Sequence, residues 1–196
     1  MKRILFVCFM LLLLTGCRAG EQTPPAPEAP EAASQQETDR APETEAPTPL
    51  GSFTAQTLTG DTLTESVFAE RALTVVNVWG TFCGPCKEEM PVLGRLHQEL
   101  EDVQVLGIVI DVTDQQGQPD ESQVALALDL LEAAEADYPN LILNESLAML
   151  GFAGVEGVPA TLFVDRDGNL VGQGFYGALD EASWREVIAQ RLEQAS

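Results

Sequence analysis

The stretch WGTFCGPCKEEMP, residues 79–91, holds two cysteines separated by Gly84 and Pro85. The β-branched apolar run LTVVNVWG, residues 73–80, leads into it, and a helical pattern over 84–100 follows. An apolar run of this length next to turn residues predicts a strand buried on both faces. The two cysteines therefore stand at a strand–helix junction, as a redox pair, half of a zinc site or a structural disulfide.

Two of these three alternatives fail on the residues available. A structural zinc site takes four ligands, whereas residues 51–196 offer only Cys83, Cys86 and a single histidine, His97, on the same predicted helix. We therefore expect no metal and no cofactor. A disulfide that closes a two-residue loop constrains little of the unfolded chain and adds little stability. The redox role fits best.

The junction gives the two cysteines different roles. Cys83 falls at the helix N-terminus, where free N–H groups and the helix dipole favour a thiolate. Pro85 suits the first helical turn because its missing N–H has no partner there to lose. Cys86 follows one turn later, close enough to attack a mixed disulfide on Cys83. Cys83 is thus the predicted attacking thiolate and Cys86 the predicted resolving thiol.

Hydrophobic periodicity gives the order of the other elements. GSFTAQTLTGDTLTES, residues 51–66, predicts a β-hairpin around Gly60-Asp61, and VQVLGIVIDV, residues 103–112, predicts a second buried strand. The remaining predicted elements are a helix at 121–137, a short strand at 141–144, a short helix at 145–152, a hairpin at 160–175 with its turn at 165–169, and a helix near 180–194. This order predicts an α/β domain with a mixed sheet.

Residues 1–16 have the features of a targeting segment. Two basic residues precede an apolar run, residues 4–14, which is too short to cross about 30 Å of hydrocarbon at about 1.5 Å per residue. The sequence Leu14-Thr15-Gly16-Cys17 resembles a bacterial lipobox, which implies that Cys17 carries a lipid. An ordinary secretory signal that happens to contain a cysteine is the alternative.

Composition separates a tether from a single domain. Residues 17–50 are expected to comprise the lipidated Cys17 and a disordered Pro/Glu-rich tether, because 18–50 contain seven of the chain's twelve prolines and few large apolar residues. Residues 51–196 are long enough for one domain. The formal net charge of −21 disfavours binding to nucleic acid. The acidic surface either keeps the domain soluble or recognises a basic partner.

The block W-G-T-F-C-G-P-C-K-E-E-M-P resembles the active-site block of the TlpA/ResA-like thioredoxin-fold proteins. The later Val158-Pro159-Ala160-Thr161 stands where that family has a cis-proline that faces the cysteines. The resemblance implies a thioredoxin-like fold with an N-terminal β-hairpin and a central βα insertion. It also implies that Pro159 is cis and that Val158 offers its backbone to an extended substrate. A plain strand-start proline is the alternative.

The resemblance adds three positions around the cysteines. Glu89 matches a family carboxylate that could accept a proton from Cys86 or tune its pKa, and a solvated surface residue is the alternative. Asn77 stands where thioredoxin has a buried aspartate, and an amide cannot take a proton. Trp79 is expected to shield the cysteines and to contact the substrate. Phe82 replaces the tryptophan that the family more usually has before the first cysteine.

The function implied by the resemblance is a membrane-tethered protein-disulfide reductase. The Gly-Pro dipeptide of thioredoxin favours the reducing direction. Its expected partners are protein disulfides and, because disulfides persist outside the cytoplasm, a membrane protein that supplies electrons. We expect a monomer, lipid-anchored on the extracytoplasmic face of the cell membrane. A DsbA-type oxidase or isomerase and a non-catalytic binding lipoprotein are alternatives. The peroxiredoxin pattern Pro-x-x-x-Thr-x-x-Cys fails, with Val76 and Gly80 at its first two positions.

Overall fold

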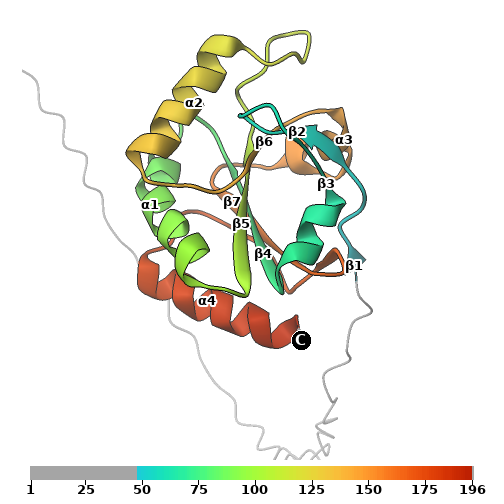
Figure 1. Ribbon diagram of the computed structural model, residues 1–196, viewed down its shortest axis with the longest axis vertical. Coiled ribbons are helices and arrows are strands. Elements are labelled where there is room, and N and C mark those ends of the chain that lie inside the picture. Colours follow the sequence, from blue (N-terminus) through green and yellow to red (C-terminus); the bar gives the residue numbers. More distant parts are fainter. Residues whose placement is uncertain (1–47, 196) are drawn as a thin grey trace, which may run out of the picture. The chain divides into compact units, whose positions relative to one another are not determined.

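A mixed β-sheet runs through the centre of the computed structural model, which describes residues 48–195 (Figure 1). The strand order is β1-β8-β7-β4-β5-β6, and β9 also pairs with β7. The strands are β1 (Thr48–Pro49), β4 (Leu73–Trp79), β5 (Val103–Val109), β6 (Asn140–Ile142), β7 (Ala160–Asp165), β8 (Asn169–Leu170) and β9 (Phe175–Tyr176). Strand β4 is parallel to β5 and antiparallel to β7, and β5 is parallel to β6. The predicted mixed sheet is confirmed.

Both faces of the sheet are covered, as Figure 1 shows. One face packs against the helices α1 (Gly84–Glu99), α2 (Glu121–Ala133) and α4 (Glu181–Gln194). The other packs against the hairpin β2 (Thr54–Gln56) and β3 (Thr62–Thr64), the 3-10 helices η1 (Glu65–Glu70) and η2 (Phe152–Gly154), and the helix α3 (Glu145–Met149). Every residue of β4 and β5 is therefore buried.

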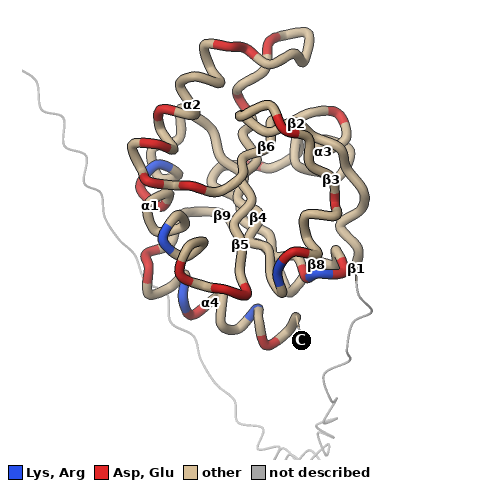
Figure 2. Tube along the Cα trace, viewed as in Figure 1, with Lys and Arg blue, Asp and Glu red and all other residues tan. Residues whose placement is uncertain are grey.

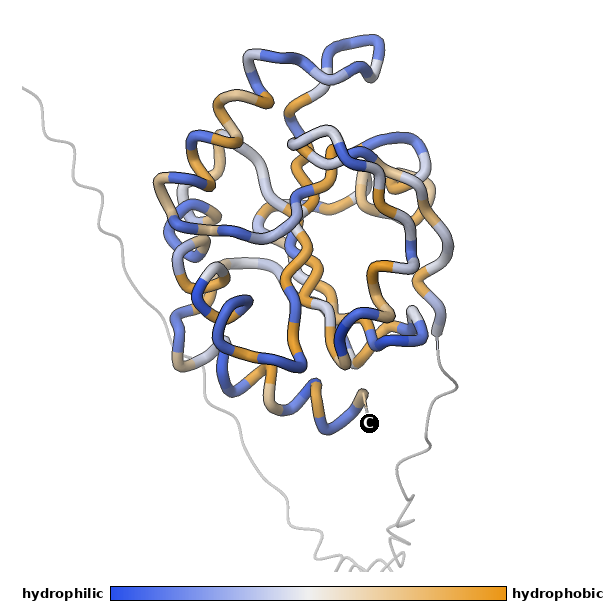
Figure 3. The backbone as a smooth tube through the Cα atoms, viewed as in Figure 1, coloured by the Kyte–Doolittle hydropathy of each residue, from blue (hydrophilic) through white to orange (hydrophobic). Residues whose placement is uncertain are grey.

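Alternation along β4 and β5 divides the core into two clusters. Val75 and Val105 pack with the α1 side, whereas Val76 and Leu106 pack with the hairpin side. This division follows from the two-residue repeat of a strand, which sends successive side chains to opposite faces. The apolar residues accordingly concentrate along the central strands (Figure 3).

Acidic residues dominate the outer surface of the described domain (Figure 2). The longest stretch of the chain without lysine or arginine is residues 96–165. This part of the chain includes α2, β6 and α3. Among the described residues, three ion pairs form, and all of them join α1 to α4 or lie within α4: Arg95–Glu181, Arg185–Glu99 and Arg185–Glu181.

The predicted order of elements is confirmed, and two boundaries differ. Helix α2 ends at Ala133 instead of 137, because Glu135 takes a left-handed backbone conformation with φ 52° and turns the chain. The second strand of the predicted 160–175 hairpin is only β8, and Phe175–Tyr176 form the separate strand β9 opposite Thr161 and Ala160. The turn at 165–169 is present, with Gly168 at φ 81°.

Two further features lie around the predicted domain start. Thr48 and Pro49, assigned above to the tether, pair with β8, and Leu50 N–H donates to Gly168 C=O. The 3-10 helix η1 was not predicted, and it buries Phe68 against the sheet. The central insertion of α2, β6 and α3 between β5 and β7 is confirmed.

Several predictions concern residues that the structure does not describe. The signal segment 1–16, the lipid-bearing Cys17 and the tether up to residue 47 lie outside the described residues. Within residues 48–195, none of the helices combines the length and the apolar character that crossing a bilayer requires.

Candidate redox-active site

The cysteine pair lies where β4 gives way to α1, as predicted from the sequence. Cys83 is the N-cap residue of α1, Pro85 lies in its first turn, and a disulfide joins Cys83 to Cys86. The Cys86 N–H donates to Cys83 Sγ at 3.2 Å. Cys83 is 5 % exposed and Cys86 1 % exposed. The sulfur of Cys83 therefore receives the N–H group and the dipole that favour a thiolate in the reduced protein.

Trp79 lies in the interior of the domain. Its side chain is fully buried, and its indole N–H donates to Asn140 Oδ1 at 2.8 Å. Gly107 makes room for this bond, because a Cβ there would lie 1.8 Å from Asn140 Oδ1. Trp79 packs in the same buried cluster as Cys83 and Cys86, and its contact with a substrate stays a prediction. The exposed aromatic ring beside the cysteines belongs to Phe82, which is 67 % exposed.

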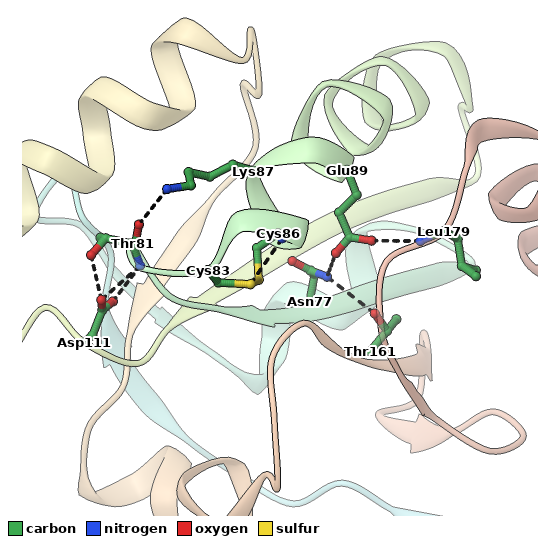
Figure 4. The surroundings of a disulfide bond; sticks show 9 residues. All are labelled: Asn77, Thr81, Cys83, Cys86, Lys87, Glu89, Asp111, Thr161 and Leu179. Atoms are coloured by element: carbon green, nitrogen blue, oxygen red, sulfur yellow. Dashed lines mark hydrogen bonds between the residues drawn. A yellow bond between two sulfur atoms is a disulfide. The ribbon is translucent and has the colours of Figure 1, made fainter.

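Glu89 is a buried residue, so the solvated-surface alternative is wrong. Only 2 % of the residue is exposed, and its carboxylate lies on the inner side of α1 near the disulfide (Figure 4). Asn77 Nδ2 donates to Glu89 Oε1 at 3.0 Å, and Leu179 N–H donates to Oε2 at 3.4 Å. Asn77 Nδ2 also lies 3.4 Å from Thr161 Oγ1. Asn77 of β4 and Leu179, just before α4, thus bind the carboxylate of Glu89 on α1, and Thr161 of β7 contacts Asn77.

Burial changes the acidity of Glu89. Removal from water raises the pKa of Glu89 to about 7, although hydrogen bonds from Asn77 and from Leu179 N–H, and the nearby Trp184 side chain, oppose the shift. The Trp184 indole N–H lies close enough to favour the ionised carboxylate, yet it makes no hydrogen bond of normal geometry within the described residues. Burial, with the Glu89 charge as a lesser cause, also raises the pKa of Tyr138. Glu89 is therefore the group here that can exchange protons near neutral pH.

The Val158–Pro159 peptide bond is cis, as the resemblance implied. Ala160 pairs with Val78 in the register of β7 and β4, so Pro159 comes at the end of β4 from which the cysteine motif continues. Pro159 C=O accepts the Gly177 N–H at 2.8 Å. Within residues 48–195, the backbone N–H and C=O of Val158 have no hydrogen-bond partner. A neighbouring hollow of about 330 Å³ is lined by Glu156, Gly157, Val158, Pro159, Tyr176 and Gly177.

His97 has a structural position away from these groups. Its Nδ1 accepts the Val105 N–H at 3.0 Å, and its ring packs edge-on against Tyr138. Burial, followed by the nearby Arg71 charge, lowers the pKa of His97. Among residues 48–195, no group of three or more histidine, cysteine or acidic side chains is arranged to hold a metal ion.

The sequence reasoning missed part of this site. Thr161 was quoted in the Val-Pro-Ala-Thr motif without a role, and its position after the proline was the available signal. Leu179 contributes its backbone N–H, which leaves no trace in residue type. Asp111 and Lys87 hold the turn before Cys83 (Figure 4). Lys87 stands inside the block 79–91 and Asp111 after the second buried strand, and neither was given a role.

The geometry agrees with the relatives of this chain. The profile of the AhpC/TSA family matches residues 39–185, which is most of the sequence. The chain belongs to the AhpC/TSA family. Within it, the chain is 31% identical over 147 residues to the thiol:disulfide interchange protein DsbE of Pseudomonas fluorescens biotype C, covering 74% of each chain. It is 28% identical over 98 residues to the thiol-disulfide oxidoreductase ResA of Bacillus thuringiensis, covering 50% of this chain and 51% of that one.

Solved structures show the same fold. A thioredoxin-family thiol:disulfide interchange protein from Chlorobium tepidum superposes with a TM-score of 0.61 at 20% identity, covering 75% of this chain and 97% of that one. The thioredoxin-like fold predicted from the sequence is confirmed. This member of the AhpC/TSA family is a thiol–disulfide oxidoreductase of the DsbE/ResA type, with Cys83 and Cys86 as its Cys-X-X-Cys pair.

Proposed function

We propose that this oxidoreductase is a membrane-tethered reductase that transfers electrons from its cysteine pair to disulfides of secreted or envelope proteins. The observation that carries the proposal is the buried carboxyl of Glu89 next to a cysteine pair whose first member caps a helix. This arrangement supplies a stabilised thiolate and a proton acceptor within one site. A disulfide present only for stability needs neither of them.

The reaction begins with the reduced protein. The Cys83 thiolate attacks one sulfur of a client disulfide; the client S–S bond breaks, and its other sulfur leaves as a thiolate that takes a proton. Cys86 then loses its proton to Glu89 and attacks Cys83 Sγ. The second client sulfur leaves as a thiolate, and the Cys83–Cys86 disulfide forms. Two electrons pass from the protein to the client, which is reduced to two thiols.

The substrate position in this proposal is next to Val158. Its backbone N–H and C=O have no partner within the described residues, and Pro159 follows at the end of β4 that leads to the cysteines. An extended client segment that pairs with these two groups would be held alongside the cysteine motif, as β-strand addition holds peptides elsewhere. Phe82, exposed beside Cys83, offers an apolar contact to the same segment.

The direction of electron flow is tested by the reduction potential of the Cys83–Cys86 pair. Thioredoxin-type pairs lie near about −270 mV and strongly oxidising pairs of the DsbA type near about −120 mV. We expect a value below about −200 mV, because Gly84-Pro85 is the thioredoxin dipeptide. A value well above that limit in glutathione or dithiothreitol redox buffers would instead assign the chain to the oxidase or isomerase alternative.

Activity separates the reductase from a non-catalytic binding protein. The wild-type chain should accelerate the reduction of insulin by dithiothreitol, and Cys83→Ser should abolish the acceleration. The Cys86→Ser variant should keep attack but lose resolution, and so retain clients as mixed disulfides on Cys83. Mass spectrometry of the captured proteins identifies the clients and any membrane electron donor. An inactive wild-type protein would favour the binding role.

The membrane tether rests on the lipobox-like Leu14-Thr15-Gly16-Cys17. Cells given an alkyne-tagged fatty acid should label the wild-type chain and carry it in the membrane fraction. Cys17→Ser should lose the label and the membrane attachment, whereas the matched change Cys8→Ser, within the leader, should lose neither. Unlabelled wild-type protein in the soluble extracytoplasmic fraction would point to an ordinary secretory signal.

A further inference from the structure

The turn that leads into Cys83 is held by two charged side chains from other parts of the fold. Thr81 N–H lies 3.0 Å from both carboxylate oxygens of Asp111, and Thr81 Oγ1 donates to Asp111 Oδ2 at 2.6 Å. Lys87 Nζ donates to the Thr81 C=O at 3.3 Å. Figure 4 shows Asp111 below Thr81 and Lys87 above it. The backbone N–H, the hydroxyl and the backbone C=O of Thr81 are therefore all hydrogen-bonded to charged side chains. Asp111 is distant in sequence, and Lys87 lies one helical turn beyond Cys83.

These contacts fix the backbone directly before the cysteine. Thr81 lies between the end of β4 and the N-cap Cys83, and Cys83 N–H donates to Gly80 C=O at 3.0 Å. The Phe82 ring lies against Gly80, where a Cβ would come within 2.6 Å of the ring. A rotation of this turn that displaces Thr81 together with Cys83 breaks the bonds to Asp111 and Lys87.

The bonds from Asp111 differ in kind from the surface ion pairs of this domain. Thr81 is only 8% exposed, so water competes poorly for its N–H and hydroxyl, and hydrogen bonds to an ionised carboxylate are stronger than neutral ones. In contrast, Arg95 and Glu181 are 48% and 41% exposed at their side chains, and such pairs contribute little. The contact between Asp111 and Thr81 is thus a specific attachment of this turn to the end of β5.

We propose that Asp111, assisted by Lys87, is a positioning residue for thiol–disulfide exchange: through Thr81 it holds the Cys83 sulfur at the N-terminus of α1, in the orientation from which it attacks. The inference rests on the proposed role of Cys83 as the attacking thiolate. A sulfur that swings away from α1 loses the Cys86 N–H and the helix dipole, which stabilise its thiolate. It also loses the alignment that displacement at a client sulfur requires.

The negative charge of Asp111 makes two explanations distinguishable: positioning of the Cys83 sulfur, and a direct electrostatic effect on the Cys83 thiolate. If the carboxylate acted on Cys83 only through its charge, its removal would stabilise the thiolate and lower the pKa of the Cys83 thiol. Release of Cys83 from the helix terminus has the opposite sign and raises that pKa. Lys87, Glu88 and Glu89 in the first turns of α1, and Glu156 and Tyr176 in the hollow beside Pro159, remain unchanged in an Asp111 variant.

The test follows alkylation of Cys83 by iodoacetamide in the full-length reduced chain. The parent carries Cys86→Ser, so Cys83 cannot form its disulfide, and peptide mass spectrometry reads the Cys83 site alone across a pH series. Asp111→Asn and Thr81→Val should slow the reaction at neutral pH by about tenfold or more and move its pH profile upward. Lys87→Met should have a smaller effect in the same direction.

Matched variants provide the comparison. Asp114→Asn changes a loop aspartate that accepts hydrogen bonds from the backbone N–H groups of Gln116 and Gln118. Thr81→Ser keeps the hydroxyl that binds Asp111. Both variants should be alkylated at a rate within about twofold of the parent, a much smaller change than misplacement of Cys83 produces. Circular dichroism checks folding, and Thr81→Val, which replaces one hydroxyl, serves if Asp111→Asn unfolds.

Two results would overturn the inference. In one, Asp111→Asn and Thr81→Val react like Asp114→Asn, or the Asp111→Asn profile moves to lower pH as loss of charge alone predicts. In the other, Cys83 of the parent reacts no faster than free cysteine; that result contradicts the attacking role itself, and the inference fails with it. The alkylation rate of Cys83 in the parent, which carries no change at Asp111 or Thr81, distinguishes the two failures.

Discussion

Asn77 Nδ2 lies 3.0 Å from Glu89 Oε1, with both residues buried beside the disulfide. Asn77 belongs to β4 and Glu89 to α1, so the bond ties the central strand to the helix that carries the cysteines. Because residue 77 is an asparagine, Glu89 is the only member of this hydrogen-bonded pair that has a carboxyl group. Two testable consequences follow from its pKa of about 7, one for stability and one for the reaction.

Stability should depend on the ionisation of Glu89. In the unfolded chain its pKa is the ordinary 4.5, and in the folded protein it is about 7. Between these values the folded state keeps a proton that the unfolded state has lost, so the free energy of unfolding falls as pH rises through this window. The full penalty, present above pH 7, is about 3 kcal/mol.

Glu89→Gln should remove this penalty and its pH dependence. Urea unfolding of the oxidised wild type and variant at pH 4.5, 7 and 9 measures it: the difference between the two proteins should change by about 3 kcal/mol in favour of the variant from the lowest to the highest pH. Lost hydrogen bonds shift the whole curve and leave its slope intact. Parallel curves for the two proteins would contradict a raised pKa of Glu89.

Resolution of a mixed disulfide should require the Glu89 carboxylate. Because general-base assistance is worth about 10²-fold or more, Glu89→Gln should slow release of thionitrobenzoate from a Cys83 mixed disulfide by that factor. The wild-type rate should rise through pH 7, and this rise should be absent in the variant. Glu88→Gln, a change at the exposed neighbour, is the control and should resolve at the wild-type rate. Equal rates in all three would assign the proton to water.

The hydrogen bond of Trp79 should contribute to stability instead of substrate binding. Trp79→Phe leaves Asn140 Oδ1 buried without its donor, which costs about 1–3 kcal/mol beyond the loss of ring contacts. Trp184→Phe is the matched control, because Trp184 is equally buried but its indole N–H makes no hydrogen bond of normal geometry among the described residues. Denaturant unfolding should show the larger loss for Trp79→Phe. A larger loss for Trp184→Phe would contradict the assignment.

Gly94 should tolerate no side chain, since α1 packs there against the turn after α2. A Cβ on Gly94 would lie 2.7 Å from Glu135 C=O and 2.9 Å from Ala136 Cα, both backbone atoms. Gly94→Ala should therefore lower the free energy of unfolding by about 1–3 kcal/mol. Gly84→Ala, in the same helix with nothing within 4 Å of its added Cβ, should be neutral or slightly stabilising in the same measurement.

The order of strands and helices could be predicted because it depends on local patterns. The β-branched run before Trp79 and the helical spacing after Cys83 each occupy one continuous stretch, and their periods of two and 3.6 residues distinguish strand from helix. The roles of Cys83 and Cys86 likewise follow from neighbours in sequence. The end of α2 was misplaced because Glu135, a residue that seldom adopts positive φ, turns the chain where the sequence has no glycine.

The site around the cysteines depended on contacts between distant residues. The family resemblance singled out Glu89 but left open whether it is buried, and only the packing of α1 on the sheet decides that Glu89, and not the neighbouring Glu88, loses its water. The same holds for Trp79, whose ring turns inward to meet Asn140, 61 residues later, while Phe82 faces solvent.

The sequence by itself determined the strand–helix junction, the two thiols and the α/β order, because each is fixed by residues adjacent in the chain. The tertiary structure decided which groups surround the thiols: Glu89 with Asn77, and Thr81 with Asp111, 30 residues away. The physical reason is that a pKa and an orientation depend on solvent exclusion and on hydrogen-bond partners. Both arise only when segments far apart in the chain pack together.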